Sequence, residues 1–342
     1  MAKRSPFEQL DRVVTALLAG AQALPADAKL AALLRLAGEL RVLPSEEFKA
    51  SLRADLRRRQ TMGTKPVPVP DDMQTATPES RKRTPGAREG FTTLTPYLIV
   101  SEAADLIDFV KQTFGAEEIF RSVGSAGGIH CEMRLDDSML MIGGGGPGLA
   151  WRGDSIPMAF HVCVPDCDAA YNRALEAGAT SIGEPIDQPY GERSGGVKDK
   201  SGNVWYIATV KGENYKWEGA PAVQPYMHPL RAGPVVKFLE EAFGARELGR
   251  YETPDGVIHH NTVRIGTGQL EMGEAQGPYQ PMPGTFFLYV PDTDTIYNRA
   301  LQVGATSLYP PADQPYGDRG AGVRDPFGNT WYISTHSKDV QP

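Results

Sequence analysis

Two histidines are the first candidates for chemistry in this sequence. His130 and His260 occupy the same place in two related stretches, HCEMRL and HNTVRI. Strand alternation places His130, Glu132 and Arg134 on one face. A neutral imidazole there could act as a general base, because its ordinary pKa lies near physiological pH. The alternative is a histidine hydrogen-bonded within a sheet, and the residue types leave both interpretations open.

Two polar loops form a second group of candidates. Tyr190 and Arg193 lie in QPYGER, and Tyr316 and Arg319 lie in QPYGDR. An aromatic ring and a guanidinium in one Pro/Gly-framed loop are suited to clamp a carboxylate or a phosphate at a cavity mouth. The same arginines could equally pair with the neighbouring acidic residues.

Patterns of other enzyme classes are missing from the sequence. It has no GxSxG elbow and no HExxH motif, and GGGGPG over 143–148 lacks the Lys-Ser/Thr pair of a phosphate-binding loop. Cys131, Cys163 and Cys167 lack the paired spacing of a zinc site, so we expect buried free thiols. A nucleophilic hydrolase is therefore not expected.

The elements that position these candidates occur twice. YNRALEAGATS over 171–181 reappears as YNRALQVGATS over 297–307, and DQPYGERSGGVKDKSGNVWYIAT over 187–209 reappears as DQPYGDRGAGVRDPFGNTWYIST over 313–335. Within each copy the apolar spacing predicts a strand, a helix and then strands, and this order is given twice. The sequence therefore predicts an α+β fold with two βαβββ units in each copy.

The rest of the chain differs in composition from the two copies. The first residues show apolar positions at helical spacing, and the stretch that follows them is rich in Pro, Thr and charged residues. The predicted organisation is a helical segment over 1–60, a flexible linker over 61–92, domains over 93–210 and 221–336 joined by a linker over 211–220, and a tail over 337–342.

Charge and hydropathy limit the partners. Residues 1–60 hold eleven Lys and Arg against seven Asp and Glu, whereas the remainder holds twenty-four against thirty-five. The acidic remainder argues against nucleic acid as a partner, while residues 1–60 could bind an acidic protein partner. No apolar stretch is long enough for a membrane span, and the first residues lack the apolar run of a secretory signal. A cytoplasmic protein, as monomer or homodimer, is expected.

The motifs TPYLIV, FGAEE, VPDCDAAYNRALEAGAT and DPFGNTWYI resemble the PhnB-like branch of the vicinal oxygen chelate superfamily, which includes glyoxalases and bleomycin-resistance proteins. The resemblance covers residues 93–210 and 221–336. It implies a curved eight-stranded sheet per copy around a cavity, with helices on the outer face. Members that bind a metal place four ligands in that cavity.

Most of these ligands are missing here. In the first copy no residue at the four positions binds a divalent ion well, so no metal is expected there. In the second copy Gln224 and Glu271 are retained, and His228 or His260 could supplement them to hold Ni, Zn, Mn or Fe. His161 lies two residues beyond one position. The implied positions are Thr95, Met141, Ala159 and Tyr206 in the first copy, and Gln224, Glu271, about Thr285 and Tyr332 in the second.

Three functions follow from these observations. The first is a protein of the resistance type that binds a small molecule in a sheet-lined cavity without a metal. The second is a metal-dependent lyase, isomerase or oxygenase centred on the second copy, with Gln224 and Glu271 as ligands and His260 as base. The third is a metabolite sensor that binds a partner through residues 1–60.

Overall fold

The computed structural model describes residues 84–211, 220–277 and 279–339, which belong to one compact unit, Ala76–Pro342. The helical segment predicted over 1–60 and most of the linker predicted over 61–92 lie outside the described residues. In the part of the chain that is described, no helix combines the length and the apolar character that a membrane span requires.

Each copy contains two units of one strand, one helix and three strands, as the sequence predicts. The first copy consists of β1 (Leu94–Val100), α4 (Ala103–Phe114), β2 (Glu117–Val123), β3 (Ile129–Leu135), β4 (Ser138–Gly144), β5 (Ala159–Cys163), α5 (Cys167–Glu176), β6 (Thr180–Asp187), β7 (Glu192–Lys198) and β8 (Val204–Val210). The second consists of β9 (Val223–Met227), α6 (Ala232–Phe243), β10 (Arg246–Glu252), β11 (Ile258–Ile265), β12 (Gly268–Met272), β13 (Thr285–Tyr289), α7 (Thr293–Gln302), β14 (Thr306–Asp313), β15 (Asp318–Arg324) and β16 (Thr330–His336).

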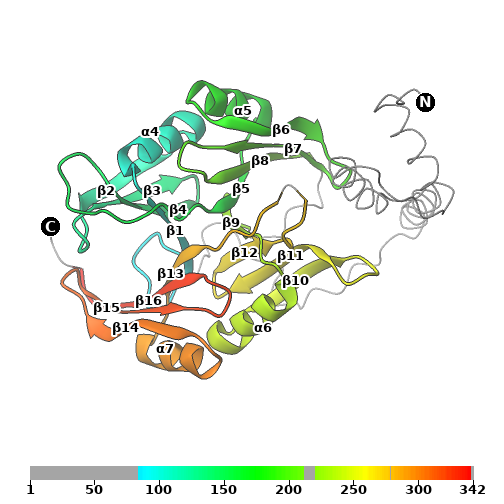
Figure 1. The fold of residues 1–342 in the computed structure, drawn as a ribbon. Helices are drawn as coiled ribbons and strands as arrows, with labels where there is room; N and C mark the ends of the chain where they lie inside the picture. The colour runs from blue at the N-terminus through cyan, green and yellow to red at the C-terminus, as the bar shows by residue number, and fades with distance from the viewer. Residues whose placement is uncertain (1–83, 212–219, 278, 340–342) are drawn as a thin grey trace, which may run out of the picture. The chain divides into compact units, whose positions relative to one another are not determined.

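The strands form two eight-stranded sheets, and each sheet combines one unit from each copy (Figure 1). Sheet 1 has the order β14-β15-β16-β13-β1-β4-β3-β2, and sheet 2 has the order β10-β11-β12-β9-β5-β8-β7-β6. The predicted fold class is confirmed. The expectation that each copy builds its own sheet is wrong, because β1 pairs with β13 and β5 pairs with β9, both antiparallel. These pairings satisfy strand edges that a single copy would leave open.

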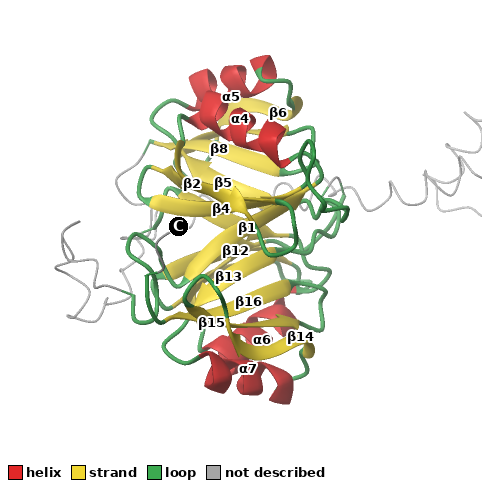
Figure 2. Ribbon diagram, turned by 90° about the vertical axis from the view of Figure 1, so that its left-hand side faces the viewer, coloured by secondary structure: helices red, strands yellow, loops and turns green. Residues whose placement is uncertain are grey.

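The helices, in contrast, pack within their own copy. Helix α4 contacts α5 and helix α6 contacts α7, and the two helix pairs lie on opposite outer sides of the unit (Figure 2). Trp205 of β8 lies 5.2 Å, centroid to centroid, from Phe114 at the end of α4. Trp331 and Phe243 repeat this contact in the second copy at 4.8 Å. The two helices of a copy therefore form one layer, whereas the strands of that copy are divided between the two sheets.

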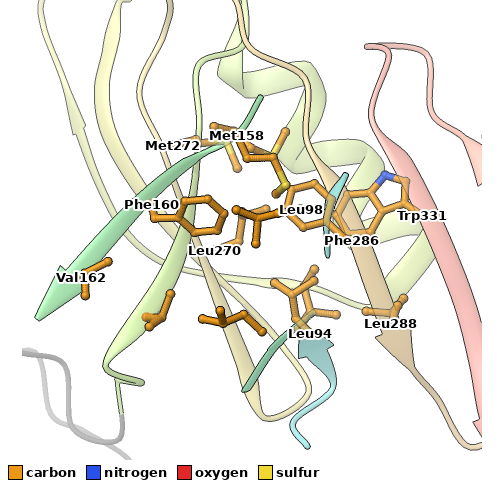
Figure 3. Packing of buried hydrophobic residues seen from close by; sticks show 14 of the residues in the cluster. Leu94, Leu98, Met158, Phe160, Val162, Leu270, Met272, Phe286, Leu288 and Trp331 are labelled. Carbon is orange, nitrogen blue, oxygen red and sulfur yellow. The ribbon is translucent and has the colours of Figure 1, made fainter. Parts of the chain in front are cut away.

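Side chains from both sheets pack into one apolar core. Figure 3 shows Leu98 of β1 and Phe286 of β13 beside Phe160 of β5 and Leu270 of β12. Phe160 stacks on Trp205 and Phe286 stacks on Trp331, at 4.6 and 4.4 Å between centroids. This shared core makes the two copies one folding unit, since separating them would expose large apolar side chains from both.

A buried aspartate holds the tight turn over residues 199–205, which the second copy repeats over 325–331. Asp199 Oδ1 accepts hydrogen bonds from the backbone N–H groups of Ser201 and Asn203, and its Oδ2 accepts from Asn203 Nδ2 and Trp205 Nε1. Gly202 takes a φ of 90°, which favours glycine. Asp325 and its neighbours repeat the arrangement. The repeated DxxGNxW pattern therefore has a structural role.

Candidate functional site

One face of sheet 2 carries the polar groups at the positions that the family resemblance implies for metal ligands. Gln224 on β9 lies opposite His161 on β5, which in turn lies beside Tyr206 on β8. Glu271 on β12 pairs with Tyr226, two residues along β9 from Gln224. Because side chains alternate along a strand, these five residues point to one face. We call this the site face of sheet 2.

His161 is held on this face between two carboxylates. Its Nδ1 donates a 2.9 Å hydrogen bond to Glu271 Oε2, and its Nε2 lies 3.2 Å from Glu192 Oε1. The three side chains are only 10%, 7% and 3% exposed. Solvent therefore screens their charges weakly, and each electrostatic contact is stronger than it would be at the surface.

The protonation of this cluster follows from burial and charge. Burial opposes a charge on the ring, but Glu271 and Glu192 raise the pKa of His161 well above its ordinary 6.5. Burial likewise opposes a charge on Glu271, but His161 and His260 lower the pKa of this carboxyl. At neutral pH the site therefore holds an imidazolium bound to a carboxylate.

Aromatic rings lie beside this ion pair. Tyr206 donates its hydroxyl proton to His228 Nε2 at 2.9 Å, and His228 Nδ1 donates to the Gly273 carbonyl at 3.3 Å. Burial lowers the pKa of His228, which agrees with a neutral ring in this tautomer. The ring stacks on Tyr279 with centroids 5.2 Å apart and lies 5.0 Å from Tyr226. The site face thus combines a buried charge pair with an apolar rim.

His260 and Tyr190 lie at the exposed side of this cluster. His260 Nε2 is 3.6 Å from Glu271 Oε2, and its side chain is 38% exposed. Tyr190 is 51% exposed and interacts electrostatically with Glu192 and His161. The structure therefore brings the predicted residues Gln224, Glu271, His260 and Tyr190 together around His161.

The corresponding face of sheet 1 has a different chemistry. Thr95, Phe287 and Tyr332 form the equivalent row across β1, β13 and β16. Met141 on β4 stands where sheet 2 has Glu271, because it pairs with Tyr97 in the same register. None of these five side chains is a carboxylate or an imidazole. The implied positions Thr95 and Met141 of the first copy therefore lie on one face with Tyr332 of the second copy, instead of with Tyr206 of their own copy.

His130 has the same kind of partner as His260 in spite of this difference. Its Nε2 lies 3.3 Å from Glu132 Oε1, and its Nδ1 lies 3.2 Å from the Tyr97 hydroxyl. Glu132 on β3 pairs with Met141, whereas Thr262 on β11 pairs with Glu271. Sheet 1 therefore carries its carboxylate on β3, one strand away from Met141, the position that corresponds to Glu271. The interpretation of His130 as a hydrogen-bonded sheet residue fits this geometry, and its role as a base stays a prediction.

The two loop arginines bind carboxylates of the same chain. Arg193 Nη2 donates to Asp168 Oδ1 at 2.7 Å, and Arg319 Nη2 donates to Asp294 Oδ1 at 2.8 Å. Of the two alternatives that the sequence leaves open for these arginines, this geometry agrees with pairing to acidic residues of the same chain. Tyr316, the counterpart of Tyr190, is 50% exposed. A ligand clamp formed by these loops stays a prediction, and a ligand would have to compete with the aspartates for the guanidinium groups.

The side chains on the site face of sheet 2 do not, as arranged, fit a bound metal ion. A histidine that binds a metal must offer an unprotonated nitrogen, but both ring nitrogens of His161 face carboxylates. Of the other three positions, Glu271 is paired with His161, and Gln224 and Tyr206 offer an amide and a phenol, which are weak ligands for a divalent ion. Within residues 84–211, 220–277 and 279–339, no three His, Cys, Asp or Glu side chains are grouped to hold a metal.

Two residues of this site were not assigned to it from sequence. The sequence predicts only that His161 lies two residues beyond an implied ligand position. Its parallel pairing with Tyr206 and antiparallel pairing with Gln224 place it in the row itself. The sequence predicts that Glu192 lies in the QPYGER loop, but it begins β7 with its carboxylate buried. Strand periodicity indicates the face of His161 but not which strand lies beside it.

The thiols of Cys131 and Cys167 are buried, as expected, whereas Cys163 is only partly buried, so the expectation is wrong for that residue. Burial raises the pKa of Cys131 and of Cys167 to about 11. Thiols of this kind are inert at neutral pH, since the thiolate is the reactive form.

Comparisons with known proteins agree with this architecture. An uncharacterized protein of Mycobacterium tuberculosis is 37% identical over 131 residues, covering 35% of this chain and 77% of the relative, and one of Mycobacterium bovis is 37% identical with 86% of its length covered. Glyoxalase I from Zea mays shares the fold, with a TM-score of 0.54 at 13% identity over 71% of this chain and 92% of that chain. The profile of one family matches residues 91–207 and 233–333. The chain belongs to the Glyoxalase/Bleomycin resistance protein/Dioxygenase superfamily.

Proposed function

We propose that the site face of sheet 2 binds a small molecule without a metal ion, in the manner of a binding or sequestering protein. The observation that supports this is the buried cluster of His161, Glu271 and Glu192 beside a rim of aromatic rings. Burying ionised groups costs free energy, which their mutual attraction offsets only in part. Such a cluster is more easily explained by binding than by stability alone.

The chemistry of the face indicates what would bind. Gln224 Oε1 is buried and has no hydrogen-bond partner among the described residues, so it offers an acceptor to a ligand N–H or O–H group. Tyr226 and His228 offer ring surfaces next to it. A small aromatic compound with a hydrogen-bond donor, such as a phenol or an aromatic amine, fits these groups.

The test is a thermal-shift screen of phenols and aromatic amines, followed by calorimetric titration of those that stabilise the protein. A ligand of this site should raise the Tm of the wild type and lose at least tenfold in affinity in Gln224→Leu and Glu271→Gln. The matched control is Glu252→Gln, a carboxylate change at an exposed position of β10, which should bind as the wild type does. Equal binding by Gln224→Leu and the wild type would contradict the proposal.

A metal-dependent lyase, isomerase or oxygenase is the second candidate. The observation in its favour is that Gln224, Glu271 and His161 share one face, so loss of the His161 proton would leave three donors side by side. Equilibrium titration with Ni, Zn, Mn and Fe decides between the two. About one equivalent bound by the wild type and lost in Glu271→Ala would favour the metal; binding that is equal in both would not.

The sensor hypothesis concerns residues 1–60, which lie outside the described residues. It stays a prediction that deletion of these residues removes a protein partner while ligand binding by sheet 2 is retained. An unchanged set of bound proteins after the deletion would contradict it.

A further inference from the structure

Residues 84–93 pack onto the face of sheet 1 that corresponds to the site face of sheet 2. Phe91 and Ala87 are buried there in a cluster with Met141 and Tyr289, separate from the main core. The Phe91 ring meets Tyr289 edge to face, with centroids 5.5 Å apart. We call residues 84–93 the plug.

The plug covers the position that is polar in sheet 2. Met141 is the counterpart of Glu271, and the partly buried side chains of Tyr97 and Phe287 pack against the same cluster. Phe287 is in turn the counterpart of His161, since each pairs with a tyrosine on the last strand of its unit. The aromatic ring of the plug therefore lies where a ligand of sheet 1 would lie.

The positively charged Arg88 of the plug pairs with a buried carboxylate of sheet 1. Glu132, whose side chain is 2% exposed, forms an ion pair with Arg88. The other carboxylate oxygen, Oε2, is buried, and no residue in the described part of the chain forms a hydrogen bond with it. The Arg88 guanidinium also lies over the Phe91 ring, 5.1 Å from its centroid. Ring and cation are thus held together on this face, the ring on apolar side chains and the cation on a carboxylate.

The plug is held by hydrogen bonds at its ends and near its middle. Thr84 and Thr93 both form hydrogen bonds with Thr267 in the turn between β11 and β12, and the Gly86 carbonyl accepts one from the His336 N–H. An open pocket of about 330 Å³ adjoins Arg88 and Phe91, and its wall includes Glu132 and Met139. The Arg88 side chain, 36% exposed, therefore borders solvent beside the buried Glu132.

We propose that this face of sheet 1 is a second binding site, which the plug occupies in this structure through Arg88 and Phe91. Its ligand is a small molecule in which an aromatic ring carries an amidinium, guanidinium or ammonium group. The ring replaces Phe91 against Met141 and Tyr289, and the cation replaces Arg88 at Glu132. This site is independent of the function proposed for sheet 2.

Benzamidine, an aromatic amidine, is the probe, titrated calorimetrically into the full-length chain. The double variant Arg88→Ala/Phe91→Ala should bind it at least tenfold more tightly than the wild type, because the plug no longer competes. Adding Glu132→Gln should reverse this gain. A folded double variant with no gain, or a gain that survives Glu132→Gln, would overturn the proposal. Phe238→Ala, which opens a space in the core away from Glu132, is the control and should bind benzamidine no more tightly than the wild type does.

The wild type provides a second test that does not depend on a variant folding. The amides of Ala87 and Phe91 form short-range hydrogen bonds to Thr84 and Arg88. If the plug opens, they should exchange with deuterium at least a hundredfold faster than the β1 amides, and saturating benzamidine should accelerate them further. Exchange of the plug only together with β1 would show that it is a permanent part of the fold and would overturn the proposal.

Discussion

His161 and Glu271 stand 110 positions apart, in different copies of the repeat, and His161 Nδ1 donates a 2.9 Å hydrogen bond to Glu271 Oε2. This contact exists because β5 of the first copy and β9 of the second lie side by side in sheet 2, with β12 next to β9. A site that neither copy contains alone is therefore assembled by the pairing of strands between copies.

Removing one partner of this buried pair should destabilise the protein. Glu271→Gln leaves the His161 imidazolium without its hydrogen-bonded carboxylate, and we expect a loss of about 3 kcal/mol in the free energy of unfolding. Urea denaturation followed by circular dichroism measures it. The control is Glu252→Gln, whose side chain is 41% exposed and whose effect should stay below about 0.5 kcal/mol. Equal midpoints for the two variants would show that the pair contributes nothing.

The same pair makes stability depend on pH in a defined direction. The pKa of His161 is raised in the folded state, so its contribution is complete below its unfolded value of about 6.5 and is lost as pH rises through the folded pKa. The pKa of Glu271 is lowered, so its contribution is present above about 4.5 and is lost as pH falls through the folded pKa. The free energy of unfolding should therefore decline on the alkaline side, and His161→Gln should flatten that decline. An NMR titration that finds His161 at its ordinary pKa would contradict this.

The buried turn aspartates should be essential for stability. Asp199→Ala removes the acceptor of four hydrogen bonds. Two come from the backbone N–H groups of Ser201 and Asn203, and two come from the side chains of Asn203 and Trp205. Buried donors left without partners cost about 1–3 kcal/mol each before relaxation, so a loss of at least 3 kcal/mol is expected. Asp325→Ala, the matched change in the second copy, should cost a similar amount. A loss below 1 kcal/mol in either variant, measured by thermal unfolding, would show that water replaces the carboxylate.

Each copy alone should associate with itself. A fragment of residues 84–211 keeps the helix layer of α4 and α5 but leaves β1 and β5 without their partners β13 and β9. Two such fragments can restore both pairings, so a homodimer is expected in sedimentation or light-scattering experiments. The full-length chain at the same concentration is the comparison. A stable monomeric fragment would show that the helix layer is sufficient to hold a copy together.

Much of the fold follows from local patterns. The repeat predicts two related copies, and the alternation in HCEMRL places Cys131 and Met133 in the core with Glu132 on the opposite face, as observed. The DxxGNxW pattern predicts its tight turn because a buried carboxylate and a glycine with positive φ are both local requirements. Superfamily membership is also evident from sequence motifs, whereas the PhnB-like branch stays a prediction.

The partners of the site residues were decided by the tertiary structure. Alternation shows which way the side chain of His161 points, but the identity of the neighbouring strand depends on edges that meet only after the chain has folded. The sequence therefore predicts that each copy forms its own sheet, and it predicts Glu271 as a site residue without its partner His161. For the same reason the ion pair of Arg88 with Glu132 could not be predicted. The sequence by itself determined the units, their turns and their apolar faces, because these depend on near neighbours; only long-range strand pairing brought His161 to Glu271 and Phe91 to Met141.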